Sequence, residues 1–428
     1  MRKIQTLRDV VDWQLCIGCG ACYYACDQGV ISLENVEDAG IRPRFHGDGC
    51  GTCTRCLSFC PGNTVDGDLM TEGRPKTTEF DHEFGQTLEI WQGYASDPEI
   101  RHLASSGGLL SALSLYCLEK GGMNRVVHSG MDPEKPWLNK TQTSVNREDI
   151  LSKTGSRYAP SSPCDSLDLI EKGEGLSVFI GKPCDAATVC QLATEKVELG
   201  EKLGVVLSFF CAGTPSTRAT LDLLDSMDIP REEIDTLRYR GEGWPGGFKV
   251  RYRNREKEKF MTYKDSWGTI NRYRPLRCTI CPHGLGRVAD LSCGDAWNDY
   301  DDTRQDEGQS IVLVRTERGR RILHGAIEAG YVTLSRITPQ QVVDAQPLLQ
   351  RRRDVFARIL GMKFCLLPTP SFPNFSLLRS WKNLPLKRKL RITSGTVRRV
   401  LTRGLWKRKQ YFTDPEDPSL MDPALRED

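Results

Sequence analysis

The 428-residue chain lacks any run of about 18 apolar residues, so we expect no membrane-spanning helix. Its first residues, MRKIQTLRDVVDWQ, lack the apolar stretch of a signal peptide. Net charge is only +3, which is too little for a protein that binds polyanions with its whole surface. We therefore expect a cytoplasmic protein, in which the 17 cysteines stay reduced and bind metal in preference to forming disulfides.

Eight of these cysteines form a repeated motif. CIGCGACYYACD begins at Cys16 and CGTCTRCLSFCP begins at Cys50, and both read C-x2-C-x2-C-x3-C. The first three thiolates of such a motif bind one cuboidal cluster, and the fourth binds the other cluster. This crossing assigns one [4Fe-4S] cluster to Cys16, Cys19, Cys22 and Cys60, and a second to Cys50, Cys53, Cys56 and Cys26. The alternative is paired structural zinc, which more often uses two separated C-x2-C pairs.

The two copies resemble bacterial-type two-cluster ferredoxins, with one departure. Asp27 stands where a proline usually follows the fourth cysteine, as Pro61 does in the second copy. Reduction adds negative charge to a cluster, so an acid beside it should lower its reduction potential.

From about residue 86 the pattern becomes α/β. LEIWQGYA predicts a strand, SSGGLLSALSLYCLEKGG a loop and a helix, and NRVVHSG the next strand. Ser106, Gly107 and Gly108 therefore lie at a helix N-terminus, which suits a phosphate, although an ordinary serine cap is the alternative. GEGWPGG, from Gly241, matches G-x-G-x-x-G, but the strand-like FKVRYR follows it where a helix should start, so we reject a Rossmann fingerprint.

Four further cysteines predict a third cluster. GLSVFIGKPCDAATVCQLA and LGVVLSFFCAGTPSTRATLDLL each read as strand, turn and helix, with Cys184 in the first turn and Cys211 at the second strand's end. The carboxyl ends of such strands meet at one edge of a sheet. RCTICPHGLGRVADLSCGDAW adds Cys278 and Cys281, and it holds Cys293 as a reserve ligand.

Five motifs in order carry a family resemblance: SSGGLLSAL, GSRYAPS, GKPCDA, FFCAGTPS and CTICPHGLGRVADLSCGDAW. Over about residues 86–340 they resemble the coenzyme F420 hydrogenase/dehydrogenase beta subunits, here fused to a ferredoxin. The resemblance implies a flavin, usually FAD, with an iron–sulfur cluster near it. It implies that the flavin is bound by Ser106, Gly107, Gly108, Ser156, Arg157 and Tyr158, and that Lys182, Pro183, Cys184 and Asp295 belong to the flavin–cluster site. That family usually has a small apolar residue where Cys293 stands, which leaves the fourth ligand of the third cluster open.

We therefore predict a mixed α/β (or α+β) fold in four parts. They are a two-cluster ferredoxin module at 1–80, a flavin-binding part at 86–165, a cluster- and flavin-binding part at 166–345, and a helical basic tail at 346–428. Residues 379–409 contain twelve Lys or Arg and no acid. This basic segment favours peripheral contact with an anionic membrane surface, or a solvated or partner-docking arm. We expect no nucleic-acid binding, because the chain shows no matching module.

Three functions fit these features. The first is an FAD-dependent oxidoreductase that moves electrons between coenzyme F420 and ferredoxin-type carriers, because a flavin exchanges hydrides for single electrons. The second is a ferredoxin-dependent reductase of another small molecule, since bacterial relatives occur with surface-polysaccharide genes. The third is a non-catalytic electron-transfer subunit of a larger complex. No acid–base pair stands out, and the histidines, including His102 and His283, read as structural or surface residues.

Overall fold

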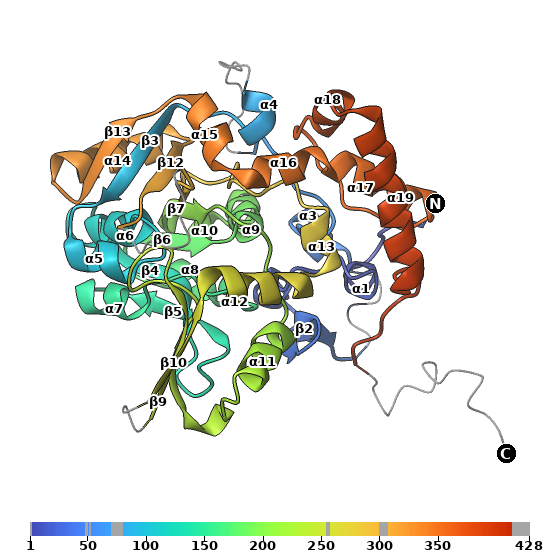
Figure 1. The fold of residues 1–428 in the computed structure, drawn as a ribbon, viewed down its shortest axis with the longest axis horizontal. Helices are drawn as coiled ribbons and strands as arrows, with labels where there is room; N and C mark the ends of the chain where they lie inside the picture. Colours follow the sequence, from blue (N-terminus) through green and yellow to red (C-terminus); the bar gives the residue numbers. More distant parts are fainter. Residues whose placement is uncertain are drawn as a thin grey trace.

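A mixed eight-stranded sheet lies at the centre of the molecule (Figure 1). The structure is a computed structural model that describes residues 2–47, 50, 53–69, 80–253, 257–298 and 307–412. From one edge to the other, the strands are β13 (Val332–Arg336), β3 (Glu89–Ala95), β12 (Ser310–Val314), β11 (Leu291–Asp295), β7 (Leu203–Phe209), β6 (Leu176–Gly181), β4 (Met123–Met131) and β5 (Asn139–Ser144). The mixed α/β fold class predicted from the sequence is confirmed.

Neighbouring strands β4, β6, β7 and β11 run parallel, so their carboxyl ends gather at one edge of the sheet. The outer strands β5, β12, β3 and β13 pair antiparallel to their neighbours. Strands from both predicted flavin parts share this sheet, because β4 pairs with β6 and β3 pairs with β12. The boundary at 165/166 stays a prediction, and both of its sides build one sheet.

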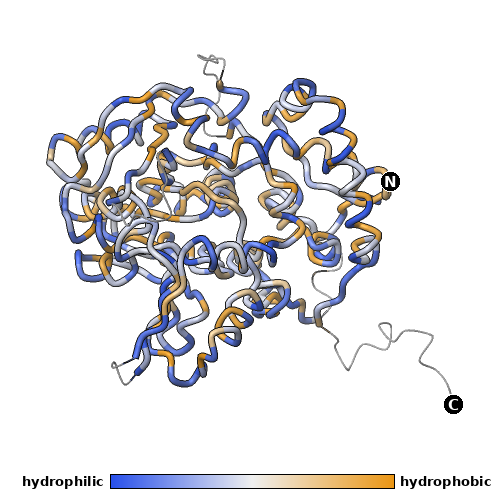
Figure 2. The backbone as a smooth tube through the Cα atoms, in the orientation of Figure 1, coloured by the Kyte–Doolittle hydropathy of each residue, from blue (hydrophilic) through white to orange (hydrophobic). Residues whose placement is uncertain are grey.

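Successive residues of the central strands face opposite sides of the sheet, as the period of a strand requires. Val126 and Val178 belong to one apolar cluster, whereas their neighbours Val127 and Phe179 belong to another. The first cluster is covered by helices α6 (Leu109–Glu119), α7 (Arg147–Ser152) and α14 (Glu317–Glu328), and the second by α8 (Asp168–Glu171), α9 (Pro183–Glu195) and α10 (Val197–Lys202). Orange, hydrophobic stretches of backbone mark these central strands in Figure 2.

The N-terminal module packs directly on the second of these faces. Its described elements are α1 (Leu7–Asp12), α2 (Ala21–Tyr24), β1 (Ile31–Val36), β2 (Gly40–Phe45) and α3 (Arg55–Ser58), with β1 and β2 paired antiparallel. Leu15 and Phe59 belong to the same apolar cluster as Phe179 and Ala187. The module is therefore held against the sheet by a shared core.

A small antiparallel sheet stands beside the large one. It consists of β10 (Glu258–Thr262), β9 (Gly247–Tyr252) and β8 (Ile234–Arg238), covered by α11 (Thr217–Ser226) and α12 (Tyr263–Ile270). Strand β9 begins at Gly247, directly after GEGWPG, so no helix follows the glycine string and our rejection of a Rossmann fingerprint is confirmed.

The C-terminal part is helical. Its helices are α15 (Pro339–Ala345), α16 (Pro347–Arg353), α17 (Val355–Phe364), α18 (Leu377–Lys382) and α19 (Leu386–Thr402). Three further helices lie earlier in the chain, and they are α4 (Asp81–Phe84), α5 (Pro98–Leu103) and α13 (Leu276–Thr279). The basic helix α19 lies along α17 at the side of the molecule (Figure 1). Beyond it, the guanidinium of Arg408 forms an ion pair with Asp9, so the tail folds back onto α1. Within the described ranges, no helix is both long and apolar enough to cross a bilayer.

Candidate functional site

Three thiols of the first motif lie close to Cys60 of the second motif, and Cys22 lies close to Cys56 as well. Burial raises the pKa of Cys22 well above its usual value, and the neighbouring thiolates of Cys19, Cys16, Cys56 and Cys60 raise it further. The pKa of Cys60 is also raised by burial first, and then by Cys19 and Cys16. Cys16, Cys19, Cys22 and Cys60, which we call the first thiol set, are therefore neighbours.

The second thiol set is Cys50, Cys53, Cys56 and Cys26. Burial, and then the thiolates of Cys50, Cys26 and Cys53, raise the pKa of Cys56 to about 12. Cys53 is exposed, so this set reaches the surface. Cys26 thus lies with the second motif and Cys60 with the first, which is the arrangement that crossed cluster ligation requires.

Among the described residues, no three His, Cys, Asp or Glu side chains are placed to bind one metal ion. Clusters in place of paired zinc are the prediction of the cysteine spacing in the sequence.

Asp27 follows the last cysteine of the first motif. Its carboxylate forms an ion pair with the guanidinium of Arg55 on α3. The cation offsets the charge that the sequence places beside the second thiol set. We therefore expect Asp27 to lower the potential of that cluster less than the sequence alone implies.

The four cysteines predicted for the third cluster line one cavity of about 80 Å³, the smaller cavity. This third thiol set consists of Cys184, Cys211, Cys278 and Cys281. Burial raises the pKa of Cys211 to about 12, and the thiolates of Cys278 and Cys281 contribute to this rise. We predicted Cys184 in the turn, but it is the second residue of α9, because Pro183 occupies the first position of that helix.

Cys16 also lines the smaller cavity, so the first and third thiol sets share a wall. Cys293 does not line it. This residue lies on β11 opposite Phe209 of β7 and Val312 of β12, and it lines a larger cavity. Burial alone raises its pKa, with no thiolate contributing. The reserve ligand is therefore placed away from the third thiol set.

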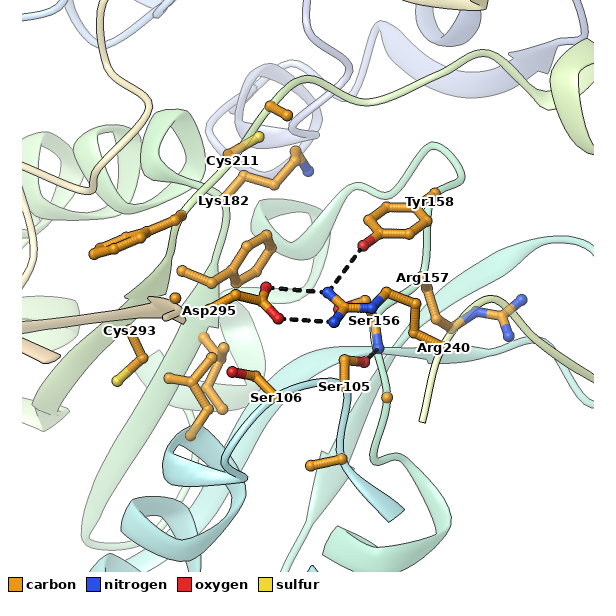
Figure 3. A pocket seen from close by; sticks show the side chains of 18 of the residues that line it. Ser105, Ser106, Ser156, Arg157, Tyr158, Lys182, Cys211, Arg240, Cys293 and Asp295 are labelled. Carbon is orange, nitrogen blue, oxygen red and sulfur yellow. Dashed lines mark hydrogen bonds and ion pairs between the residues drawn. The ribbon is translucent and has the colours of Figure 1, made fainter. Parts of the chain in front are cut away.

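The larger cavity, about 470 Å³, opens at the carboxyl edge of the parallel strands (Figure 3). Its walls come from the ends of β6, β7 and β11, the start of α6, the segment after β8 and helix α12. Of the residues implied to bind the flavin, it is lined by Ser106, Gly108, Ser156, Arg157, Tyr158, Lys182 and Asp295. Gly107 and Pro183 do not line it, and Pro183 faces the smaller cavity instead.

The start of α6 is only partly free for a ligand. Gly108 caps the helix with φ 79°, a left-handed conformation that favours glycine. The N–H of Gly107 donates a hydrogen bond to Ser310 Oγ at 2.9 Å, so it is already occupied. The Ser106 hydroxyl donates to the Gln309 carbonyl at 2.9 Å and lines the cavity. The helix N-terminus after Gly108 is what remains to hold a phosphate.

Arg157 shapes the wall and does not point its charge into the cavity. Its guanidinium donates to the carbonyls of Leu237 at 2.7 Å and Pro136 at 2.6 Å, and Figure 3 shows the side chain running away from Asp295. The neighbouring Ser156 N–H donates to the Ser105 hydroxyl. These hydrogen bonds therefore fix the GSRYAPS loop, which carries Tyr158.

Sequence reasoning missed Arg240, the principal cation of the larger cavity. Its two terminal nitrogens donate to Asp295 at 3.0 and 2.7 Å, and Trp244 Nε1 donates to the same carboxylate at 2.9 Å. The guanidinium also lies over the rings of Tyr263 and Trp297, at 4.6 and 5.2 Å from their centroids. No motif marks Arg240 in the sequence, and its only signal is its position beside the rejected glycine string.

Lys182 lines both cavities. Its ammonium forms an ion pair with Asp185 at 2.7 Å and donates to the Ser161 hydroxyl at 3.0 Å. Burial lowers its pKa, but the carboxylate of Asp185 and the thiolates of Cys184 and Cys211 outweigh burial and raise it overall. A permanent positive charge therefore stands between the larger cavity and the third thiol set.

Comparison with known families agrees with this geometry. Residues 90–167 and 176–340 match the N-terminal and C-terminal models of the coenzyme F420 hydrogenase/dehydrogenase beta subunit. Residues 15–64 match the 4Fe-4S dicluster domain. The two F420 models together cover nearly all of the large sheet and most of the lining of the larger cavity.

The individual relatives have low sequence identity to this chain, but each aligns with more than half of it. The chain is 24% identical to the coenzyme F420 hydrogenase subunit beta of Methanosarcina barkeri, over 58% of this chain and 81% of the relative. It is 26% identical to the F420-dependent formate dehydrogenase 1 subunit beta of Methanococcus maripaludis, over 59% of this chain and 62% of the relative. A chain of the solved F420-reducing [NiFe] hydrogenase complex from Methanosarcina barkeri shares its fold, with TM-score 0.53, 20% identity, and coverage of 67% of this chain and 97% of that one. The chain therefore belongs to the coenzyme F420 hydrogenase/dehydrogenase beta subunit family and carries a 4Fe-4S dicluster domain at its N-terminus.

Proposed function

We propose that this chain is an FAD-dependent iron–sulfur oxidoreductase that moves electrons between coenzyme F420 and ferredoxin-type one-electron carriers. The observation that carries the proposal is the continuity of the sites. Lys182 and Cys211 line both cavities, and Cys16 joins the smaller cavity to the first thiol set. A bound flavin supplies the exchange between a hydride and single electrons, which iron–sulfur clusters carry onward.

The larger cavity has the chemistry that FAD needs. The N-terminus of α6 after Gly108 offers backbone N–H groups to a phosphate. Tyr158 and Trp267, whose ring centroids are 4.8 Å apart, offer an aromatic wall. Lys182 stands at the side that faces the thiols, where its charge stabilises negative charge on a reduced group.

The thiol sets define an order along the chain's own residues. The third thiol set lies beside the larger cavity. The first set shares the wall of the smaller cavity with the third set, and the second set includes the exposed Cys53. We place three [4Fe-4S] clusters on these sets, with the outer end at Cys53. A ferredoxin or a partner redox subunit would exchange electrons there, because short transfer distances require an exposed cluster edge.

The relatives are named as subunits of hydrogenase and formate dehydrogenase, which supports a partner subunit for this chain as well. The basic helix α19 supports a second contact. Lys387, Arg391 and Arg398 are exposed on it, together with Leu390 and Leu401. We propose that this face of a cytoplasmic protein rests peripherally on an anionic membrane surface.

A second candidate function is a ferredoxin-dependent reductase of another small molecule. The exposed Cys53 favours it equally, because electrons can enter at that end as well as leave. The identity of the hydride partner separates the two candidates.

The test uses the anaerobic holoprotein with reduced F420, NADH, NADPH or reduced ferredoxin added in turn. Bleaching of the flavin by reduced F420 is expected. Bleaching by ferredoxin alone would support the second candidate and contradict the first. In Cys53→Ser, reduced F420 should still bleach the flavin, whereas transfer to a one-electron acceptor should fall at least tenfold.

Cys365→Ser is the matched control, because this thiol lines neither cavity. It should keep both activities. If Cys53→Ser stays folded and flavin-loaded but loses both bleaching and one-electron transfer, the two-ended arrangement is wrong.

A further inference from the structure

The smaller cavity is surrounded by positive charge. Of its described lining residues, none is Asp or Glu. Its seven cationic side chains are Arg42, Lys182, Arg274, Arg277, Arg351, Arg352 and Arg358. Four of these residues, Arg42, Lys182, Arg277 and Arg352, are buried.

Arg274 is held in this cationic lining by two backbone carbonyls. Its Nη1 donates to the Ala212 carbonyl at 2.8 Å and its Nε to the Asn271 carbonyl at 3.1 Å. A Cβ on Gly213 would lie 2.7 Å from Arg274 Cδ, so the loop after Cys211 packs directly on the arginine stem. Arg274 is therefore fixed beside a thiol of the third set.

Its charged neighbours are two arginines and two thiols of the third set. Burial lowers the pKa of Arg274, Arg351 and Arg358 lower it further, and the thiolates of Cys278 and Cys211 oppose them. Of the three arginines, Arg358 has a nearby carboxylate, Asp354, at 3.9 Å. Like charges gathered in a partly buried site repel one another, so the site is suited to an anion.

The third thiol set supplies that anion when it holds a cluster. A [4Fe-4S] cluster with four thiolate ligands is negative, and reduction adds one more negative charge. Burial disfavours the added charge, whereas each nearby cation favours it. A unit charge roughly 10 Å away, at an effective dielectric constant of about 20, changes the equilibrium constant for reduction by roughly tenfold.

We propose that Arg274, Arg351 and Arg358 raise the reduction potential of the third cluster and make it the most readily reduced of the three clusters. The inference rests on the proposed function, because it requires a cluster on the third thiol set. The second thiol set has fewer cations beside it: Arg55 is already paired with Asp27, and Arg8 lies near Cys50. The third cluster then collects electrons between the larger cavity and the N-terminal module, whichever end supplies them.

The test is an anaerobic potentiometric titration of the reconstituted full chain, followed by electron paramagnetic resonance. The signal of the third cluster is identified as the one that disappears in Cys184→Ser. We expect it to have the highest midpoint potential of the three. Arg274→Gln should lower the equilibrium constant for its reduction about tenfold, which is about 59 mV for one electron. The other two signals should not move.

Three variants make the result decisive. Arg351→Gln should lower the same midpoint, and because Arg351 is exposed it tests the proposal even if Arg274→Gln does not fold. Arg274→Lys keeps the charge and should keep the potential. Arg321→Gln, on the exposed side of α14, removes the same charge outside the cavity and should change nothing.

The two possible failures are distinguishable. If the wild-type chain binds only about eight iron atoms and Cys184→Ser loses no signal, the third thiol set holds no cluster. The proposed function is then wrong where it places a cluster beside the larger cavity. The other failure leaves the third signal present. If neither Arg274→Gln nor Arg351→Gln shifts its midpoint potential, or if that potential is not the highest of the three, the cluster stands and the cationic tuning is overturned.

Discussion

Replacing Asp295 with asparagine should destabilise the chain more than its position at a cavity wall suggests. The change keeps the side chain's shape and removes its charge. It leaves Arg240, whose side chain is 2% exposed, without an anion. Breaking a buried pair from one side costs about 3–5 kcal/mol. The asparagine oxygen can still accept one of the two bonds, worth about 1 kcal/mol, so we expect a loss of about 2–4 kcal/mol.

The opposite change should cost less, and this asymmetry is the sharper test. Arg240→Met leaves the Asp295 carboxylate, which is 18% exposed and still accepts the Trp244 N–H at 2.9 Å. A carboxylate that is partly hydrated and still hydrogen-bonded costs less free energy than an unpaired buried cation. We therefore expect the free energy of unfolding to fall by about 1–3 kcal/mol. The double variant removes both charges, and its loss should be at least about 1 kcal/mol smaller than the sum of the single losses.

The measurement is anaerobic urea unfolding of all four proteins by circular dichroism, with iron and flavin content determined on the same samples. Equal cofactor content ensures that the differences report the ion pair and not the loss of a ligand. The reasoning is refuted if Asp295→Asn costs less than about 1 kcal/mol, or if Arg240→Met costs more than Asp295→Asn.

Three further predictions concern the other parts of the site. Anaerobic analysis should find about twelve iron atoms per chain and about eight in Cys184→Ala, and equal iron in both would remove the third cluster. Gly108→Glu should lose at least tenfold in flavin content, because it puts a carboxylate at the helix N-terminus. The control Gly108→Ala shares the strain of φ 79° and should lose less flavin. Equal flavin content in the two variants would contradict a phosphate there. Burial, and then Lys153, lower the pKa of His128 from 6.5 to about 4, so its contribution to stability is present above pH 6.5 and is lost as the pH falls toward 4. His128→Gln should remove up to about 3 kcal/mol of this acid dependence, measured as urea unfolding at pH 7 and pH 4.5, and parallel curves for the two proteins would count against it.

The parts of the site that the sequence predicted depend on short-range patterns. The C-x2-C-x2-C-x3-C spacing sends the fourth cysteine away from the first three, and the structure accordingly places Cys26 and Cys60 with the opposite motifs. Strand–turn–helix patterns placed Cys184 and Cys211 at one edge of parallel strands, and they line one cavity. Such inferences concern local geometry, which a few residues determine, and the binding of clusters at these thiols stays a prediction.

The parts that the sequence did not predict depend on distant segments that meet only in the fold. Asp295 belongs to a motif that the resemblance assigns to the site, whereas its partner Arg240, 55 residues away, stands in no motif. Arg157 was assigned to the flavin from its motif, yet its donors are used by backbone carbonyls of the loop before β5 and of β8. The cationic lining joins residues of α16 and α17 to the segment before α13, and no local pattern marks that meeting.

The position of the first thiol set relative to the third depends on the contact between the first cysteine loop and the segment before α8. The loop before α8 holds the first cysteine loop: the Ser162 hydroxyl donates to the Gly18 carbonyl at 2.8 Å, and the Cys164 N–H donates to the Cys19 carbonyl at 2.9 Å. A Cβ on Gly20 would lie 2.8 Å from Asp165 Cβ, so the two loops touch with no space between them. The N-terminal module is thus positioned by the flavin part itself. Because transfer rates fall steeply with distance, a change at Ser162 should slow transfer between the two sets while every cluster stays bound.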